Sequence, residues 1–490
     1  MMNLKKVLIA TMTAAAITAS TGALVMAAPE QVKVEAESEF QSSTDEETSK
    51  ILAEVKSQVL HLSEEDAEKY PALAKTLEEI STKENDEINK TFNDNREQAA
   101  QSFEDAEDKE MFGTYTDTRT ILPQRSDSAV VSFLETLSSY TGGAHGTQTF
   151  SAHNIDPETG KEIALSDVVK DEDVIRSLVK AELKEKYPEM NWDEETDKNA
   201  DDALKNPVFT IGDNGLTFWF SNYEIGSYAE GTQNVTILFN GNDAQFNEKF
   251  TDVPESYAFA FPESETASVD IKKDGDLDKV TFFGEDFDGS MFRKITVNVN
   301  DETASVDTEA NDIEGTFVKN GDKTFLYIWS NTVNDIKQLD VFSLTNGELE
   351  FVGTFELGLS GSGELTDPTS FTLMRRTSIL GSFGISGQYS VGEDGTPQAA
   401  EDIFTIEGEH TITAKKDLAL KTVDENGVEK DASITAGTEL TLFRTDNKTF
   451  VDAKEADGTI VRIDVNTEGA TKLMDGQSIE DAFDGIQFAG

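Results

Sequence analysis

Residues 208–220 read VFTIGDNGLTFWF, and this stretch decides the fold of the middle of the chain. Two apolar runs lie on either side of an Asp-Asn-Gly turn, which predicts a β-hairpin with a type I′ turn. Residues 234–239 predict another strand, and the apolar spacing within 174–183 predicts a helix. The middle of the chain is therefore expected to be an α+β unit, which we place at residues 46–262.

Two different segments precede this unit. Lys5 and Lys6 stand before an uncharged stretch that ends in small residues ahead of Pro29. This pattern is typical of a signal peptide over residues 1–27, so we expect a secreted protein, extracellular or attached to the cell wall, with no stable membrane span after cleavage. Residues 28–45 are rich in Glu, Ser and Thr and are predicted to be an acidic linker.

From residue 46 the apolar spacing becomes helical. A first helix is predicted over 51–60, a second over 64–77 after a capping box at Ser63 and Asp66, and a third over 88–103. These helices are expected to pack on the antiparallel sheet of the α+β domain.

Beyond residue 262 helical periodicity nearly vanishes. Short strands alternate with favoured turn pairs such as Asn320-Gly321 and Asn346-Gly347, which predicts an all-β domain over 263–400. Residues 401–490 are predicted to form a small β domain, with an SH3-like barrel at 411–465 as its proposed form. The fold class is thus multidomain, an N-terminal α+β domain followed by an all-β region.

Charge and composition exclude several classes of function. The chain has 41 Lys and Arg against 95 Asp and Glu, a formal charge of -54, so it is not an electrostatic nucleic-acid binder. It has no Cys, which excludes disulfides, thiolate metal sites and cysteine nucleophiles. Its four His do not follow zinc-ligand spacing, and no nucleophile-elbow pattern surrounds any Ser. Nothing in the sequence indicates an enzyme.

Two loops carry the candidate ligand-binding residues. The first reads YTGGAHG over 140–146, and its glycines predict unusual torsions or a close approach of another chain segment around one imidazole. The second, 220–231, places two tyrosines on an irregular loop where they either pack or anchor a ligand. The candidates, together with one strand tryptophan, are Tyr140, Gly142, Gly143, His145, Trp219, Tyr223 and Tyr228.

An acidic segment over 270–278 resembles the arrangement of a Ca²⁺ loop. Its oxygen ligands would come from Asp270, Asp274, Asp276 and Asp278, with Gly275 at the sharp turn. Lys272 occupies one ligand position and Thr281 stands where a bidentate Glu would complete the shell. Two hypotheses follow: a calcium site, and a solvated acidic turn before a strand.

Together the two loops resemble a known family. The Tyr-x-Gly-Gly-Ala-His-Gly core at 140–146, the hairpin at 154–161 and the Tyr-Glu-Ile-x-x-Tyr-Ala-x-Gly run at 223–231 are similar to the extracytoplasmic domain of lysozyme-sensing, RsiV-type anti-sigma factors. That domain is also found beside peptidoglycan deacetylase modules. The resemblance covers residues 50–255 and implies an α+β binding domain that in some members holds lysozyme. Only six residues precede the apolar stretch, where those factors have a sigma-binding region, so we do not expect regulation of transcription by the same route.

Three hypotheses about function follow. The first is an exported, non-catalytic binding protein that captures a cell-envelope or host ligand, such as lysozyme or another cationic protein, attracted by the acidic surface. The second is a peptidoglycan or glycan-binding wall module in which Trp219 or Trp329 stacks on sugar. The third is a carboxylate-dependent hydrolase.

Overall fold

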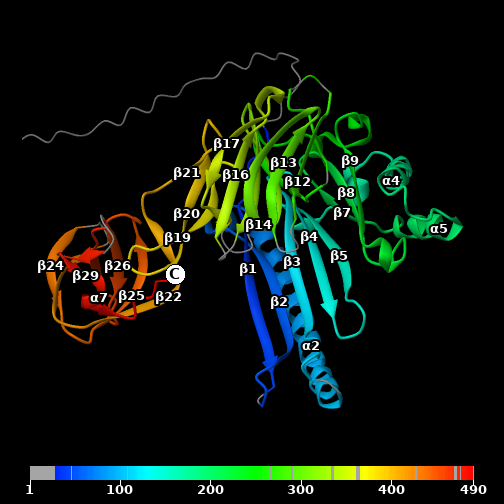
Figure 1. The fold of residues 1–490 in the computed structure, drawn as a ribbon. Helices are drawn as coiled ribbons and strands as arrows, with labels where there is room; N and C mark the ends of the chain where they lie inside the picture. Colours follow the sequence, from blue (N-terminus) through cyan, green and yellow to red (C-terminus); the bar gives the residue numbers. More distant parts are fainter. Residues whose placement is uncertain are drawn as a thin grey trace, which may run out of the picture.

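The computed structural model describes residues 28–488, except 46, 107–108, 265, 273, 275, 288–290, 333–335, 360–364, 425–427, 468–471 and 475. The proposed signal peptide lies outside the described residues. Three large sheets follow one another along the chain, and the long helix lies with the first of them (Figure 1). No helix within the described part is both long and apolar enough to cross a membrane.

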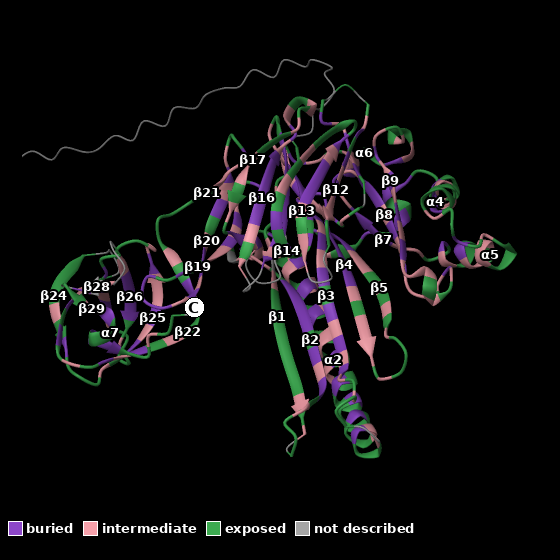
Figure 2. Cartoon of the chain, viewed as in Figure 1, coloured by how far each residue is buried: buried purple, intermediate pink, exposed green. Residues whose placement is uncertain are grey.

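The first sheet has six strands in chain order, and its second and third strands are parallel because two helices connect them. One of these, α2, presents Leu73, Leu77, Phe92 and Phe103 to the sheet and its charged side chains to solvent (Figure 2). The elements are β1 (Val34–Thr44), β2 (Ile51–Leu62), α1 (Glu64–Lys69), α2 (Pro71–Asp105), β3 (Tyr115–Ser126), β4 (Val131–Tyr140), β5 (Thr147–Asp156) and β6 (Lys161–Glu162).

Two predictions for this region are wrong. The segment expected to be a linker contains β1, an edge strand whose exposed glutamates and serines gave it the composition of a tether. The segment expected to be the first helix is β2, which buries residues on both of its faces and so lost the alternation of a half-buried strand. The predicted second helix, 64–77, covers the short α1 and the first turns of α2, and the predicted third helix, 88–103, lies within the 35-residue α2.

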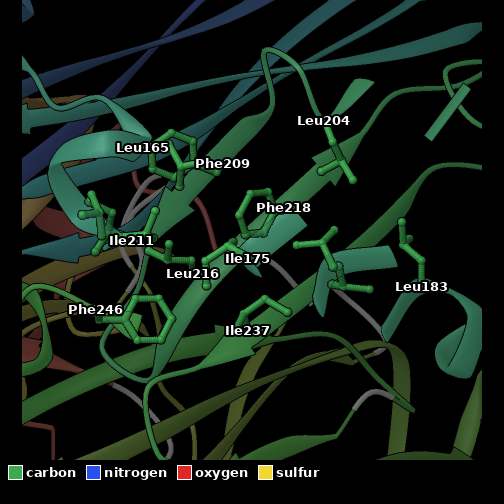
Figure 3. Close-up of a cluster of buried hydrophobic side chains, with 14 of the residues drawn as sticks. Leu165, Ile175, Leu183, Leu204, Phe209, Ile211, Leu216, Phe218, Ile237 and Phe246 are labelled. Carbon is green, nitrogen blue, oxygen red and sulfur yellow. The ribbon is translucent and has the colours of Figure 1, made fainter. Parts of the chain in front are cut away.

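A smaller α/β layer follows and packs beside β4 and β5. Its core is formed by helices resting on a three-stranded sheet (Figure 3). The Ile211 amide donates to the Ser132 hydroxyl at 2.9 Å, and the Asn154 amide donates to the Phe209 carbonyl at 2.8 Å, which fixes this sheet to the first. The elements are α3 (Leu165–Val168), α4 (Glu172–Lys186), α5 (Glu194–Ala203), β7 (Val208–Ile211), β8 (Gly215–Phe220), η1 (Tyr228–Glu230), β9 (Gln233–Leu238), η2 (Asp243–Gln245) and α6 (Glu248–Thr251).

The hairpin predicted at 208–220 is confirmed, with Ile211 opposite Leu216. Its turn is not type I′: the Gly212 amide donates to the Gly215 carbonyl, so Asp213 and Asn214 are the central residues, and neither has a positive φ. Gly215 is required for a different reason, since a Cβ there would lie 2.5 Å from the Ile237 carbonyl oxygen on β9.

The second sheet has eight antiparallel strands. The strand β10 pairs with β14, so the domain boundary expected after residue 262 falls inside this sheet and not before it. The strands are β10 (Ser256–Phe261), β11 (Ala267–Val269), β12 (Asp278–Glu285), β13 (Phe292–Val299), β14 (Glu302–Asn320), β15 (Lys323–Thr332), β16 (Lys337–Ser343) and β17 (Glu350–Phe355), with η4 (Thr345–Gly347) after β16.

The third sheet has eleven strands and runs across the boundary expected at residue 401, because Ile385 on β20 pairs with Ile406 on β22. Its described strands do not close into a barrel, so the SH3-like form is not observed. A multidomain fold of an N-terminal helix-and-sheet region followed by antiparallel strands is confirmed. The elements are β18 (Gly358–Leu359), β19 (Phe371–Thr377), β20 (Phe383–Val391), β21 (Pro397–Ala399), β22 (Phe404–Ala414), β23 (Leu418–Val423), β24 (Glu429–Ile434), β25 (Glu439–Thr445), β26 (Phe450–Lys454), β27 (Ile460–Asp464), β30 (Phe483–Asp484), and beside them β28 (Leu473–Met474), β29 (Gln477–Ser478) and α7 (Ile479–Ala482).

Candidate functional site

The glycine-rich turn joins β4 to β5 at the end of the first sheet. Gly142 and Gly143 have φ of 88° and 100°, in the left-handed region that favours glycine. A Cβ on Gly146 would lie 2.6 Å from the Ser139 carbonyl oxygen. The Tyr140 hydroxyl donates to the Gly143 carbonyl at 3.2 Å and closes the turn. The glycines thus supply both features that the sequence predicted as alternatives: unusual torsions at Gly142 and Gly143, and a close approach of the backbone at Gly146.

The loop after β8 is docked on β5 by hydrogen bonds. The Gln148 amide donates to the Asn222 side chain at 2.8 Å, and the Asn222 amide donates back to the Gln148 carbonyl at 3.1 Å. The Phe150 amide donates to the Ser221 hydroxyl at 3.0 Å. These bonds hold the second loop against β5, the strand that directly follows the glycine-rich turn.

Three aromatic side chains from these loops form one group, which we call the His–Tyr cluster: His145, Tyr223 and Tyr228. The His145 and Tyr228 rings are stacked with centroids 3.7 Å apart. The Tyr223 hydroxyl lies 3.4 Å from His145 Nε2, and the two tyrosine rings are 5.7 Å apart. Tyr223 is 54% exposed and has a positive φ of 66°, a rare conformation for a bulky residue. The two loops therefore meet in one cluster of rings.

A hollow of about 480 Å³ lies next to the cluster, and we call it the hairpin hollow. Uncharged side chains and loop backbone line it, so it offers hydroxyl, amide and phenol groups. The lining residues include Thr116, Thr118, Ser138, Tyr140, Gln148, Asn222 and Tyr228.

Both tryptophans proposed for sugar stacking lie in strands. Trp219 is partly buried, packs edge-on against Phe150 and donates its indole N–H to the Thr210 hydroxyl at 2.9 Å. Trp329 is only 7% exposed and donates to the Thr316 hydroxyl. Neither ring is part of the His–Tyr cluster.

A buried ion network that the sequence did not indicate lies on β3, β4 and β5. Glu135 accepts from Arg119 Nη2 at 2.5 Å and lies 3.8 Å from His153 Nε2, while His153 Nδ1 is 2.6 Å from Glu162. Burial alone would lower the pKa of His153, but Glu135 and Glu162 outweigh it and raise that pKa to about 9. Burial alone would raise the pKa of Glu135, but His153 and Arg119 lower it to about 2. We therefore expect this network to hold β3, β4 and β5 together. No contact joins His153 to His145 among the described residues.

A second buried charge group joins the first sheet to the segment around α6. Arg125 is 1% exposed, pairs with Asp127 at 2.7 Å and donates to the carbonyls of Phe250 and Asp252, both at 2.6 Å. Burial raises the pKa of nearby Asp213 to about 7, although Arg125 opposes the shift.

The acidic loop proposed for calcium is described at its four aspartates, while Lys273 and Gly275 lie outside the described residues. Asp278 is buried and accepts from Lys272 Nζ at 2.8 Å, so an ammonium group occupies one side of that carboxylate. Asp270 and Asp274 accept backbone amides of the loop. In the part of the chain that is described, no three His, Asp or Glu side chains gather as a metal site. Calcium binding stays a prediction, to be tested by titrating Ca²⁺ into the chain and into the Asp274→Ala, Asp276→Ala variant.

Comparison with known proteins shows a family match in the middle of the chain. Residues 165–240 match the model of DUF3298, a family of unknown function, and this segment includes Tyr223 and Tyr228. No curated protein matches the chain.

Two solved structures of that family show a weak likeness. The protein from Bacteroides fragilis is 12% identical with a TM-score of 0.34, covering 46% of this chain and 96% of its own. The protein from Pseudomonas aeruginosa is 14% identical with a TM-score of 0.32, covering 46% of this chain and 99% of its own.

Proposed function

We propose that this chain is an exported, non-catalytic binding protein that captures a cationic protein, with lysozyme as the first candidate. The observation that carries the proposal is the His–Tyr cluster, in which two loops resembling the lysozyme-sensing domain form one exposed aromatic surface. Exposed, well-supported tyrosines are typical anchors of protein interfaces.

The surroundings of His145 favour contact over acid–base catalysis. Its Nδ1 lies 3.0 Å from the Gly146 carbonyl oxygen and its Nε2 faces the Tyr223 hydroxyl. The ring is also stacked on Tyr228 with centroids 3.7 Å apart, so one face and the Nε2 edge of the imidazole are already in contact with tyrosines. The proposed role of this imidazole is to present a stacked ring to the partner.

The cluster is held in place before any partner arrives. Hydrogen bonds between β5 and the second loop fix the positions of Tyr223 and Tyr228, and the Ser227 and Glu230 capping box ends the loop at η1. Preorganised side chains lose less entropy on binding, which supports affinity from a small contact area.

The charge of the chain favours a basic partner. A formal charge of -54 would attract a cationic protein over long range and raise its association rate, and salt would weaken this attraction. Charge alone selects no particular partner, so in this proposal the aromatic contacts supply the specificity.

The test is binding of residues 28–490 to purified lysozyme by size exclusion and by surface-immobilised kinetics at two salt concentrations. Tyr223→Ala and Tyr228→Ala are expected to weaken binding by about tenfold or more each, mainly through faster dissociation. Phe287→Ala is the matched control, because Phe287 is 57% exposed against 54% for Tyr223 and lies after β12, outside both loops of the His–Tyr cluster.

Two results would contradict this proposal. One is the absence of complex at low salt. The other is binding that disappears with salt yet is unchanged in both tyrosine variants, which would mean nonspecific attraction by charge. Retention on insoluble peptidoglycan without binding to lysozyme would favour the wall-module hypothesis instead.

A further inference from the structure

A second hollow, of about 440 Å³, lies where the first sheet meets the second, and we call it the inter-sheet hollow. One wall is formed by β2, β3 and β4 and the other by β14, β15 and β16. Its size is in the range of small-molecule sites. The polar groups that line it include Gln58, Thr120, Thr136, Glu314, Thr316 and Trp329.

Gln58 is the most informative of these side chains because it is 5% exposed. Its carbonyl oxygen accepts the Ile121 amide at 2.7 Å, which fixes the orientation of the side chain. Within the described residues its NH₂ group has no acceptor, although this group is a strong donor. This nitrogen is not among the fully buried unpaired atoms of the described residues, so it is open to the hollow and can donate to a ligand oxygen there.

Hydroxyl groups add further free donors and acceptors. Thr120 and Thr136 are directly opposite each other on β3 and β4, and neither hydroxyl has a hydrogen-bond partner among the residues the structure describes. Thr316 is 3% exposed and accepts from the Trp329 indole at 3.0 Å, which leaves its own proton to donate.

The remaining lining narrows the class of ligand. The one lining cation, Lys337, donates to Asn331, and Asp312 and Glu314 lie on the same wall, so the hollow disfavours an anion. Leu122, Leu359 and the Trp329 ring supply apolar surface beside the donors. Hydroxyls, an amide and a carboxylate around an aromatic ring suit a molecule with many hydroxyl groups and apolar ring faces.

We propose that the inter-sheet hollow binds a neutral saccharide of one or two rings, with Gln58, Thr120, Thr136 and Thr316 bonding its hydroxyls and Trp329 contacting a ring face. This site is separate from the His–Tyr cluster and does not depend on the proposed capture of lysozyme. It uses side chains on a sheet face, where the backbone groups are already paired, and therefore differs from the recognition of an extended peptide at a sheet edge.

The test uses residues 28–490 and three probes, cellobiose, maltose and N,N′-diacetylchitobiose, measured by isothermal titration and saturation-transfer NMR. At least one probe is expected to bind at low-millimolar concentration or better. The Thr120→Val, Thr136→Val double variant keeps shape and strand propensity while removing two hydroxyls, and it is expected to weaken binding by about tenfold or more.

The matched control is Thr411→Val, Thr441→Val, another directly opposed threonine pair, on β22 and β25. It is expected to bind as the wild type does, and both double variants are expected to retain lysozyme unchanged. The proposal is overturned if no probe binds the wild type at tens of millimolar. It is equally overturned if the two double variants bind a probe alike.

Discussion

Replacing Arg125 by Met tests whether the buried group of Arg125 and Asp127 joins the first sheet to the layer that carries the loop at 220–231. The guanidinium is almost fully buried and makes three hydrogen bonds, to the Asp127 carboxylate and to the carbonyls of Phe250 and Asp252. Met fills a similar volume and has no donor, so the substitution removes these bonds without opening a large cavity.

The size of the destabilisation follows from the unpaired charge that Arg125→Met leaves on Asp127. Asp127 is 0% exposed, and among the described residues its carboxylate keeps the Ala129 and Val130 amides as partners, at 2.7 and 3.1 Å. Breaking one side of a buried ion pair costs about 3–5 kcal/mol, and two carbonyls also lose a charged donor. We expect Arg125→Met to lower the free energy of unfolding of this region by about 4 kcal/mol.

Urea unfolding in a Trp329→Phe background measures this, because the remaining tryptophans, Trp192 and Trp219, both lie in the layer beside β4 and β5. Adding Asp127→Asn to Arg125→Met removes the unpaired charge and is expected to recover about half of the loss. A loss below about 1 kcal/mol for Arg125→Met would refute the assigned role of this group, as would a double variant no more stable than the single one.

Two further predictions concern the hairpin that carries the imidazole. Gly146→Ala forces a Cβ against the Ser139 carbonyl and is expected to destabilise the hairpin by about 2 kcal/mol, measured as faster hydrogen exchange of its amides. It is also expected to weaken lysozyme binding. Gly143→Ala, where no atom lies within 4 Å of the new Cβ, should cost only the torsional strain of about 1 kcal/mol, and equal effects would contradict the steric argument. Because the pKa of His153 is raised from 6.5 to about 9 on folding, its stabilising contribution is complete below pH 6.5 and is lost as pH rises to 9. The free energy of unfolding, measured by urea titration at each pH, should therefore fall by about 2 kcal/mol over that range in the wild type and not in His153→Gln. The same pH dependence of stability in both proteins would contradict this prediction.

Helices and strands could be predicted from the sequence where only one face of the element is buried, because the apolar spacing then matches a single structure. The hairpin at 208–220 has two apolar strands and a polar turn, and the helix α4 has one apolar face, so each pattern matches one structure. The strand β2 buries residues on both faces: α2 covers one face, and Gln58 on the other lines the hollow between the first and second sheets. Its apolar residues then fell at helical spacing by coincidence, and periodicity alone could not separate the two.

The candidate site was predictable for a similar reason. Glycines with positive φ leave a local signal in the sequence, so the turn around His145 could be singled out before its partners were known. The ion network of Glu135 and the Arg125 group could not, because with 95 acidic residues the few buried ones carry no distinguishing local pattern. The inter-sheet hollow was missed because its walls come from strands up to about 300 residues apart.

The two proposed sites lie on one surface of the first sheet. Thr116 and Thr118 line the hairpin hollow and Thr120 lines the inter-sheet hollow, and alternate residues of a strand share a face, here the one opposite α2. Two residues of strand separate Thr118 from Thr120 by about 7 Å, so the two hollows adjoin along β3. Tyr223 does not line the inter-sheet hollow, and Thr120 and Thr136 do not line the hairpin hollow. Tyr223→Ala and Thr120→Val, Thr136→Val should therefore act independently when combined, each weakening only its own ligand. If combining them weakened the binding of a single ligand by more than the product of the separate effects, that ligand would have to extend along β3 across both hollows.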